Sequence, residues 1–581
     1  MDDRLARVES TVRELERSLA AVNARLAAIE GQPASEGDRP VPAAAPAIAS
    51  AVASRDQAAA APLVARDDLI SVLSLVGRTF VALGGAYLLR ALTDSAILPQ
   101  AGGLALGLAY ALAWLVMADR AGSAGRASSA AFHALVASMI AFPLLWEATV
   151  RFKFLEPAAT AAAVAIVAGL ALGVAVRQRL QSLAWIATLA ALPTALALIA
   201  ATRVVVPFSV FLILLGIGTL WMGYALEWVL LRWPVALVAD VAVLALTLRV
   251  SNRSWGELPA PVVAVQLFLL TGYLASIVTR TLVRARDVNV FEVVQSIAAL
   301  AVGFGGAVYV ASVTGSGVVL ALALANLMVG AGCYGVAFAF VARRQGLHRN
   351  FYFYTSLGLV LVLVSSRLLL GATEVGLVWA AIAVASAWLA RQLGRAALGL
   401  HAAVYAIAAA AASGLLAAAA SALVGSVTSA WVAFTPATLL VLAAIAACWA
   451  IAPAPDADRS GTYARIPRLF VALALVWSTS GWLVSLLTPL LSVTPGGGAD
   501  LGVVATVRTA ILAAGALALA WAGRHPRFRE AAWLLYPVLI AGGIKLLLED
   551  MPQSRPSTLF LALALYGGAL IAAPRLTHRH A

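Results

Sequence analysis

Long apolar segments recur along this chain from Leu69 almost to its C-terminal end, and they constrain the fold more than any other feature. About eighteen of them are long enough to cross a hydrocarbon core about 30 Å thick. We place them at residues 69–89, 101–118, 130–149, 157–176, 182–201, 204–226, 229–248, 261–279, 291–312, 316–341, 352–370, 375–390, 397–421, 431–452, 468–490, 501–522, 530–548 and 557–573. Backbone in lipid must satisfy its own hydrogen bonds, so the sequence predicts an all-α transmembrane bundle over residues 67–581.

The composition excludes an ordinary soluble fold. Hydrophobic residues make up 62% of the 581 residues and charged residues only 12%, whereas soluble domains carry about 25% charged residues. A soluble chain of this length cannot bury so many apolar side chains, because surface area does not shrink fast enough with size. We therefore expect the lipid bilayer to be the main partner of this protein.

Residues 1–31 differ from the rest because their apolar residues recur at alternating spacings of three and four. This seam over four heptads predicts a coiled coil, and it consists of Leu5, Val8, Val12, Leu15, Leu19, Val22, Leu26 and Ile29. We expect it to mediate homo-oligomerisation or to bind a partner protein. An amphipathic helix folded back on the protein or the membrane is the alternative. Residues 32–66, rich in Pro and Ala, predict a linker.

The net charge of +13 would suggest nucleic-acid binding in a soluble protein, but here the cations lie in short loops between apolar segments. With a cytoplasmic N-terminus, the predicted inner loops and C-terminal tail hold 21 Lys and Arg residues, and the predicted outer loops hold 9. This asymmetry follows the positive-inside rule. We therefore predict a multi-pass protein with both termini in the cytoplasm and no nucleic-acid partner.

Three ionisable residues lie deep inside predicted spans, where a charge costs about 2.5–3.5 kcal/mol on insertion scales. Asp240, near the middle of the span at 229–248, is our candidate for a proton or cation relay. A structural pair or a neutral, hydrogen-bonded acid is the alternative. Arg78 lies midway in the first span, or at the inner interface if that helix starts later. Arg508 lies about two turns into its span, from which its long side chain can snorkel outward.

Other polar residues in the predicted spans are expected to have structural roles. Glu292, Arg367 and Lys545 lie close to span ends and are expected only to anchor their helices. Gln266, Gln295 and Asn326 are expected to form hydrogen bonds between helices. The two cysteines lie in apolar segments, and the six histidines show neither an HxxxH nor an HExxH pattern. The sequence contains no Walker loop and no GxSxG, so we predict no metal site, cofactor or catalytic residue, and an enzyme is not favoured.

Residues 75–121 resemble the opening membrane motif of a bacterial family catalogued as domain of unknown function 2339. In that motif a Gly or Arg pair precedes a Gly-bearing helix, which ends in a basic residue, an Asp-containing turn and a Pro. Those places are occupied here by Gly77, Arg78, Gly84, Arg90, Asp94 and Pro99, while Ala96 stands where the family has an aromatic residue. The resemblance implies a protein of the bacterial inner membrane and supplies no reaction.

Three functions fit the sequence. The favoured one is transport or channel-like movement of a small solute, an ion or a lipid-like molecule, with Asp240 as the relay. A non-enzymatic scaffold for envelope assembly, docking through residues 1–31, is an alternative. A membrane-embedded transferase acting on a lipid carrier is another, and Asp94 and Glu257 are the predicted outer-loop acids to test for it.

Overall fold

The computed structural model of the chain describes residues 97–251, 258–315, 317–341, 348–425, 434–453, 465–491 and 500–577, with a few positions between 77 and 95. The chain divides into two units, Met1–Ala82 and Leu83–Ala581. Apart from Gly77, every described residue belongs to the second unit. The predicted coiled coil, the linker, most of the first span, and Arg78, Asp94 and Glu257 lie outside the described residues.

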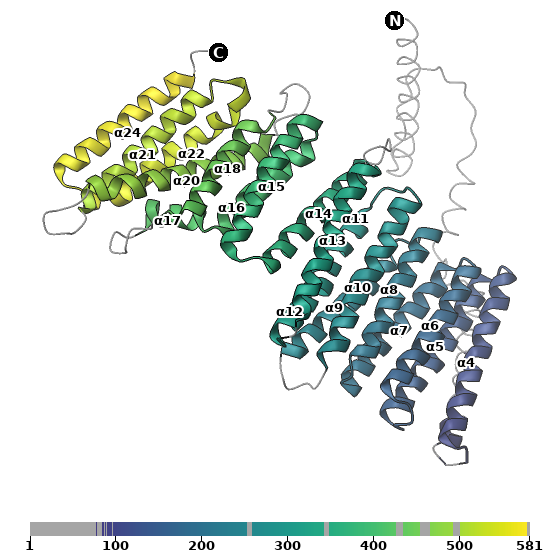
Figure 1. The fold of residues 1–581 in the computed structure, drawn as a ribbon. Helices are drawn as coiled ribbons and strands as arrows, with labels where there is room; N and C mark the ends of the chain where they lie inside the picture. The colour runs from purple at the N-terminus through teal and green to yellow at the C-terminus, as the bar shows by residue number, and fades with distance from the viewer. Residues whose placement is uncertain are drawn as a thin grey trace, which may run out of the picture. The chain divides into compact units, whose positions relative to one another are not determined.

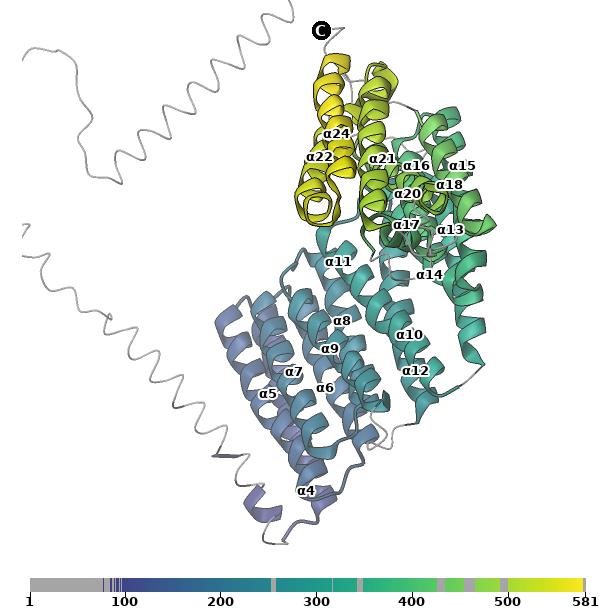
Figure 2. The same cartoon turned by 90° about the vertical axis from the view of Figure 1, so that its left-hand side faces the viewer.

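The first described helices pack side by side in alternating directions (Figures 1 and 2). They are α4 (Gln100–Ser123), α5 (Ala127–Val150), α6 (Pro157–Arg177), α7 (Gln181–Thr202), α8 (Val206–Leu226), α9 (Arg232–Ser251) and α10 (Pro259–Val278). Pro occupies the first turn of α6, α8 and α10, where its fixed φ favours a helix start and its missing N–H is not needed. The core between these helices is rich in Ala and Leu, and small side chains let the helix backbones approach closely.

The next helices contain two π-helical stretches. α10 continues into η2 (Thr279–Val283), and α11 (Val290–Ala298) continues through η3 (Ala299–Gly305) into α12 (Gly306–Val313). α13 (Val318–Ala339) and α14 (His348–Leu369) then pack against each other. π-Helical turns are rare and occur often at functional sites, so this part of the bundle is the first place to look for one.

The remaining helices form the C-terminal part of the bundle. They are α15 (Ala372–Leu393), α16 (Ala396–Ala412), α17 (Leu415–Val424), α18 (Pro436–Ile451), α20 (Ile466–Leu491), α21 (Leu501–Ala522), η6 (Pro526–Phe528), α22 (Arg529–Lys545), η7 (Leu546–Asp550), α23 (Met551–Gln553) and α24 (Pro556–Thr577). η7 is a third π-helical stretch. Close approach occurs where α17 meets α20, because a Cβ on Gly481 would lie 2.5 Å from Cα of Ala419.

The prediction of transmembrane helices is confirmed, with two differences in the count. Among the described residues, fifteen helices are long and apolar enough to cross a membrane. The predicted span at 397–421 is broken instead, because α16 and α17 meet at an angle of 65°. Gly414 lies at this break with a φ of +78°, a conformation that favours glycine. The predicted span at 431–452 corresponds to α18, which has only 16 residues.

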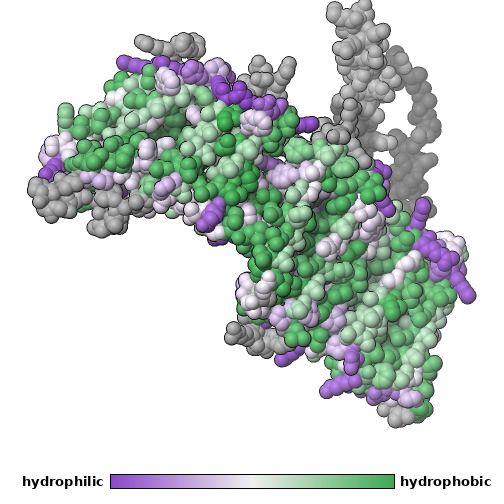
Figure 3. Space-filling view, viewed as in Figure 1, coloured by the Kyte–Doolittle hydropathy of each residue, from purple (hydrophilic) through white to green (hydrophobic). Residues whose placement is uncertain are grey.

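The sides of the helices are hydrophobic, and hydrophilic residues gather toward the helix ends (Figure 3). Large apolar side chains such as Ile166, Leu237 and Phe560 are more than 60% exposed. Such a surface belongs in lipid rather than in water. The chain is therefore a polytopic integral membrane protein.

Because successive helices run in opposite directions, the loops between them alternate between the two ends of the bundle. Loops after α4, α6, α8 and α10 lie at one end, which we call the Arg280 end, and loops after α5, α7 and α9 lie at the other, which we call the Glu147 end. Contacts between loops agree with this arrangement. Asp119 near the end of α4 accepts a hydrogen bond from Gln178 after α6, and Arg249 near the end of α9 donates to the carbonyl of Arg203 after α7.

Candidate functional site

A groove of about 1040 Å³ separates α11 and η3 from α14. Ile297 and Phe304 lie on the first wall, and Tyr352 and Val360 lie on the second. Ile297 is 63% exposed and Tyr352 is 54% exposed, so the groove opens sideways toward the surroundings of the bundle. For a helix in a bilayer those surroundings are lipid tails, and an apolar groove of this kind accepts an apolar chain.

One end of the groove is polar and lies at the Arg280 end of the bundle. Asn289 and Arg349 line the groove there, and the Arg349 side chain is exposed. Further along the groove, polar side chains are contributed by Ser296, Ser356 and Asn326. The groove therefore combines apolar walls with a cationic mouth and a small number of polar groups at depth.

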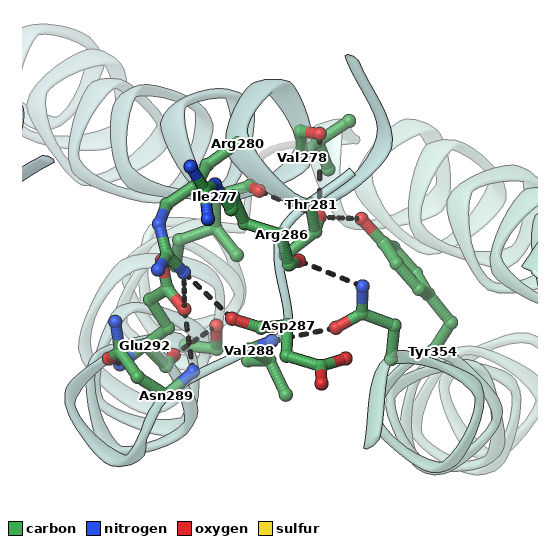
Figure 4. A network of polar contacts seen from close by, with 12 residues as sticks. Ile277, Val278, Arg280, Thr281, Arg286, Asp287, Val288, Asn289, Glu292 and Tyr354 are labelled. Atoms are coloured by element: carbon green, nitrogen blue, oxygen red, sulfur yellow. Dashed lines mark hydrogen bonds and ion pairs between the residues drawn. The ribbon is translucent and has the colours of Figure 1, made fainter. Parts of the chain in front are cut away.

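The start of α11 is held at the groove mouth by an ion pair and a helix cap (Figure 4). Nη1 of Arg280 lies 2.9 Å from both carboxylate oxygens of Glu292, whose side chain is fully buried. Asn289 caps α11 by accepting from the backbone N–H of Glu292 at 3.1 Å, and Glu292 accepts from the N–H of Asn289 at 2.7 Å. This reciprocal capping fixes where α11 begins. The interpretation of Glu292 as a simple anchor is therefore wrong.

The same network joins the two walls of the groove. Asn350 on α14 accepts a hydrogen bond from the backbone N–H of Val288 at 2.7 Å and donates to the carbonyl of Arg286 at 2.9 Å. Beside it, the hydroxyls of Thr281 on η2 and Tyr354 on α14 lie 2.6 Å apart (Figure 4). These contacts thus join the two walls at the mouth. The groove extends from them along α14 toward the Glu147 end of the bundle.

The deep part of the groove is fixed by a different contact. Asn326 on α13 donates to the hydroxyl of Ser365 at 2.7 Å and to the carbonyl of Leu361 at 3.3 Å, both on α14. This confirms the prediction that Asn326 bonds between helices. It also shows that α13 and α14 form one wall, while α11 and η3 form the other.

The side of α11 that faces away from the groove, which we call its rear, packs on α9. Asp240 is a residue of α9 at this contact. Gln295 on α11 donates to the carboxylate of Asp240 at 3.1 Å, and Asp240 is 8% exposed. Further along α9, the hydroxyl of Thr247 accepts from Gln266 of α10 at 2.8 Å. The predicted interhelical roles of Gln295 and Gln266 are confirmed. The role of Asp240 as a relay stays a prediction.

Arg508 does not snorkel outward as expected. It is 4% exposed, donates to the carbonyls of Ala422 and Gly425 at 2.9 and 2.7 Å, and pairs with Glu549 at 2.5 Å. Because α17 ends at this point, its free carbonyls need donors, and Arg508 supplies them. Arg508 of α21 thus contacts the C-terminal end of α17, the second half of the broken α16–α17 pair.

Lys545 is more than the anchor that its position near a span end predicts. It pairs with Asp550 at 2.7 Å and lies 3.6 Å from Glu549, and it also donates to the hydroxyl of Thr509 at 2.8 Å. The expectation of a simple anchor is wrong for Lys545. Arg367, by contrast, is exposed and donates to the carbonyl of Leu370 at the end of its own helix, as an anchor would.

A buried network around Glu530 was missed by the sequence reasoning. Its carboxylate is fully buried and accepts from Arg468 at 2.8 Å, from Arg465 at 3.4 Å and from the indole of Trp449 at 3.1 Å. Both arginines count as loop cations in the sequence. The signal available was Glu530 itself, an acid at the first position of a predicted span.

The structure gives the surroundings of two residues that carry the family resemblance, Arg90 and Pro99. Arg90 pairs with Glu147 of α5 at 3.0 Å, and Pro99 directly precedes α4. A Cβ on Gly77 or Gly84 would meet no atom within 4 Å. Of these residues, only Arg90 thus contributes a charged contact in the part of the chain that the structure describes.

Comparisons with protein-family models, curated proteins and solved structures give no match to this chain. The family resemblance therefore stays a prediction. Within the described residues, no group of three or more His, Cys, Asp or Glu side chains is placed to hold a metal ion. The groove between α11 and α14 is the largest of the described pockets, and it is the candidate site.

Proposed function

We propose that this protein moves a lipid-like anionic amphiphile along the groove between α11 and α14, in a bacterial inner membrane with the Arg280 end facing the cytoplasm. The observation that carries the proposal is the groove itself, with apolar walls open to lipid and an arginine at its mouth. Arg349 suits the phosphate of a headgroup, and the apolar walls suit the tails.

The length of the groove supports movement rather than simple binding. Arg349 and Val364 on α14 are 15 residues apart and both line the groove, so it extends about 22 Å at 1.5 Å per residue. One leaflet contributes only about half of a hydrocarbon core about 30 Å thick. The groove therefore passes the midplane, and Ser356 and Asn326 offer polar contacts to a headgroup on the way.

Asp240 keeps a role in this proposal. Its carboxylate is bonded to Gln295 on the rear of α11, and the front of the same helix is a wall of the groove. A change in the protonation of Asp240 would act on that wall through a single hydrogen bond. The π-helical η3 follows directly after this contact, and its irregular hydrogen bonding gives the wall a place to rearrange.

The test uses the full chain in vesicles that contain a phosphoglycerol lipid with a fluorescent tail label. A membrane-impermeant reductant bleaches the outer leaflet, and further bleaching reports movement of lipid between leaflets. We expect the protein to accelerate this movement and Ala301→Trp, in the groove wall, to return it to the protein-free rate. The matched control is Ala385→Trp on α15, which is also an exposed helical alanine and should keep the activity.

The role of Asp240 is tested in the same vesicles under an imposed pH gradient. We expect the gradient to accelerate lipid movement in the unaltered protein, and Asp240→Asn to remove that acceleration while basal movement remains. Unchanged acceleration in Asp240→Asn would remove the relay. Equal activity of the two tryptophan variants would remove the proposed function as a whole.

A further inference from the structure

A second pocket lies at the Glu147 end of the bundle, where α4 begins and α5 ends. It has a volume of about 290 Å³ and is lined by Arg90, Thr93 and Gln100 on one side and by Glu147 and Phe152 on the other. None of its lining residues lines the groove. Because α11 begins at the Arg280 end, this pocket and the groove mouth belong to opposite ends of the bundle.

The pocket holds both signs of charge side by side. Nη1 of Arg90 lies 3.0 Å from Oε1 of Glu147, and the two side chains are 38% and 16% exposed. The pair is therefore reachable from the pocket, although the walls around it are mainly apolar. A ligand that carries only one charge would meet one favourable and one repulsive partner here.

The floor of the pocket depends on two glycines one helical turn apart. A Cβ on Gly103 would clash with Thr93, and a Cβ on Gly107 would lie 2.5 Å from a methyl carbon of Leu144. Both neighbours line the pocket. A larger residue at either position would have to displace one of these two lining side chains, so glycine at both positions preserves the shape of the pocket.

The rim of the pocket is apolar and exposed. Met139 is 44% exposed and Phe154 is 46% exposed, and both belong to the lining. Phe154 follows the end of α5, whereas Met139 lies near the middle of that helix, so the rim runs from the helix end along the side of α5. A group entering here would have its polar part at the Arg90–Glu147 pair and any tail beside the rim.

We propose that this pocket binds a zwitterionic phosphoethanolamine group, with its phosphate at Arg90 and its ammonium at Glu147. Guanidinium matches phosphate geometry, and a carboxylate accepts strong hydrogen bonds from ammonium. The volume is at the lower end of the range of about 300–1,000 Å³ for ligand pockets, so it takes the headgroup and leaves tails outside. The proposal does not depend on movement of lipid along the groove.

The test measures dissociation constants of the full chain in neutral detergent. The probes are short-chain phospholipids with a phosphoethanolamine or a phosphoglycerol headgroup, and free phosphoethanolamine as a competitor. We expect the phosphoethanolamine lipid to bind about tenfold more tightly than the phosphoglycerol lipid, as one added charge-assisted hydrogen bond gives. Glu147→Gln should remove this preference, and Arg90→Gln should weaken binding of both lipids.

Two further variants control for folding. Met139→Trp narrows the rim and leaves both charges in place, and it should weaken binding of both lipids. Asp119→Asn removes the partner of Arg177, a comparable ion pair with an N–O distance of 3.2 Å at the Arg280 end, and it should change neither affinity. Helix content from circular dichroism should be equal in all variants.

The competitor separates two sources of the same chemistry. Competition by free phosphoethanolamine as strong as that of the lipid assigns a water-soluble ligand, and weak competition assigns a lipid headgroup. Both results support the site. Equal affinity for the two lipids in the unaltered chain, or a preference that survives in Glu147→Gln, would overturn it.

Discussion

The region around α20–α22 and the region around α11–α14 both carry ion pairs within or beside membrane-spanning helices. The first region is closely packed around its ion pairs, whereas the second has an open groove beside its ion pair. Around α20–α22, Glu530, Arg468 and Arg508 are each less than 9% exposed and are surrounded by partners. Around α11–α14, the ion pair of Arg280 and Glu292 closes only the mouth, and an open groove continues beside it. Ion pairs thus close the first region, and in the second they border an open groove.

The difference follows from where the partners come from. Glu530 collects donors from α18, α20 and the segment before α20, so its network draws three parts of the chain together. The ion-pair and capping partners of Glu292, Arg280 and Asn289, lie in the loop before α11 and in the adjoining η2. From the opposite wall, Asn350 and Tyr354 of α14 contact this loop and η2. We therefore expect substitutions around α20–α22 to affect stability more than activity. Substitutions around α11–α14 should affect activity more than stability.

The largest effect on stability is expected from Glu530→Gln. Removing this carboxylate leaves Arg465 and Arg468 buried without their counter-charge, and breaking a buried pair costs about 3–5 kcal/mol. Thermal unfolding in detergent should show a large fall in midpoint, with Asp119→Asn, which removes a half-buried carboxylate paired with the exposed Arg177, as a control that changes little. A midpoint equal to that of the control would mean that this region does not owe its closure to charge.

An intermediate effect is expected from Asn350→Ala. The backbone N–H of Val288 and the carbonyl of Arg286 lose their partner, and an unsatisfied buried group costs about 1–3 kcal/mol. The walls of the groove should also separate at the mouth, which a spin-label distance between positions 293 and 360 would measure. If stability falls and this distance stays the same, the ties at the mouth do not set the width of the groove.

The smallest effect on stability, with a clear effect on activity, is expected from Arg349→Gln. An exposed side chain contributes within about 0.5 kcal/mol, so the unfolding midpoint should stay close to that of the unaltered chain. Movement of a phosphoglycerol lipid should slow, while that of a lipid with no net charge should change less. Equal slowing of both lipids in Arg349→Gln, or no slowing of either, would show that the mouth does not select by charge.

Hydropathy predicts the spans because each crossing is a local property of about 20 residues. The break at Gly414 escapes this reasoning, since the residues on both sides of it are equally apolar. The ion pairs between helices could not be predicted in this way. Arg508 and Glu549 are 41 positions apart, and Arg468 and Glu530 are 62 apart, so no local pattern connects them.

The groove was not predictable for a related reason. Ile297, Val360 and their neighbours have the composition of any lipid-facing helix surface, and only the spacing between α11 and α14 turns that surface into a groove. Asn326 and Gln295 were predictable as hydrogen-bond donors, because an amide in an apolar segment needs a partner. Which helix supplies that partner depends on tertiary packing.

The most direct test of the account is a map of where lipid tails lie on the protein. A phosphoglycerol lipid with a photoactivatable group in its tail is incorporated into vesicles with the full chain, and cross-linked peptides are identified by mass spectrometry. We expect strong labelling within residues 293–305 and 352–364, which Ala301→Trp suppresses. Labelling spread evenly over the exposed faces of all helices, including α15, and unchanged by Ala301→Trp, would contradict it.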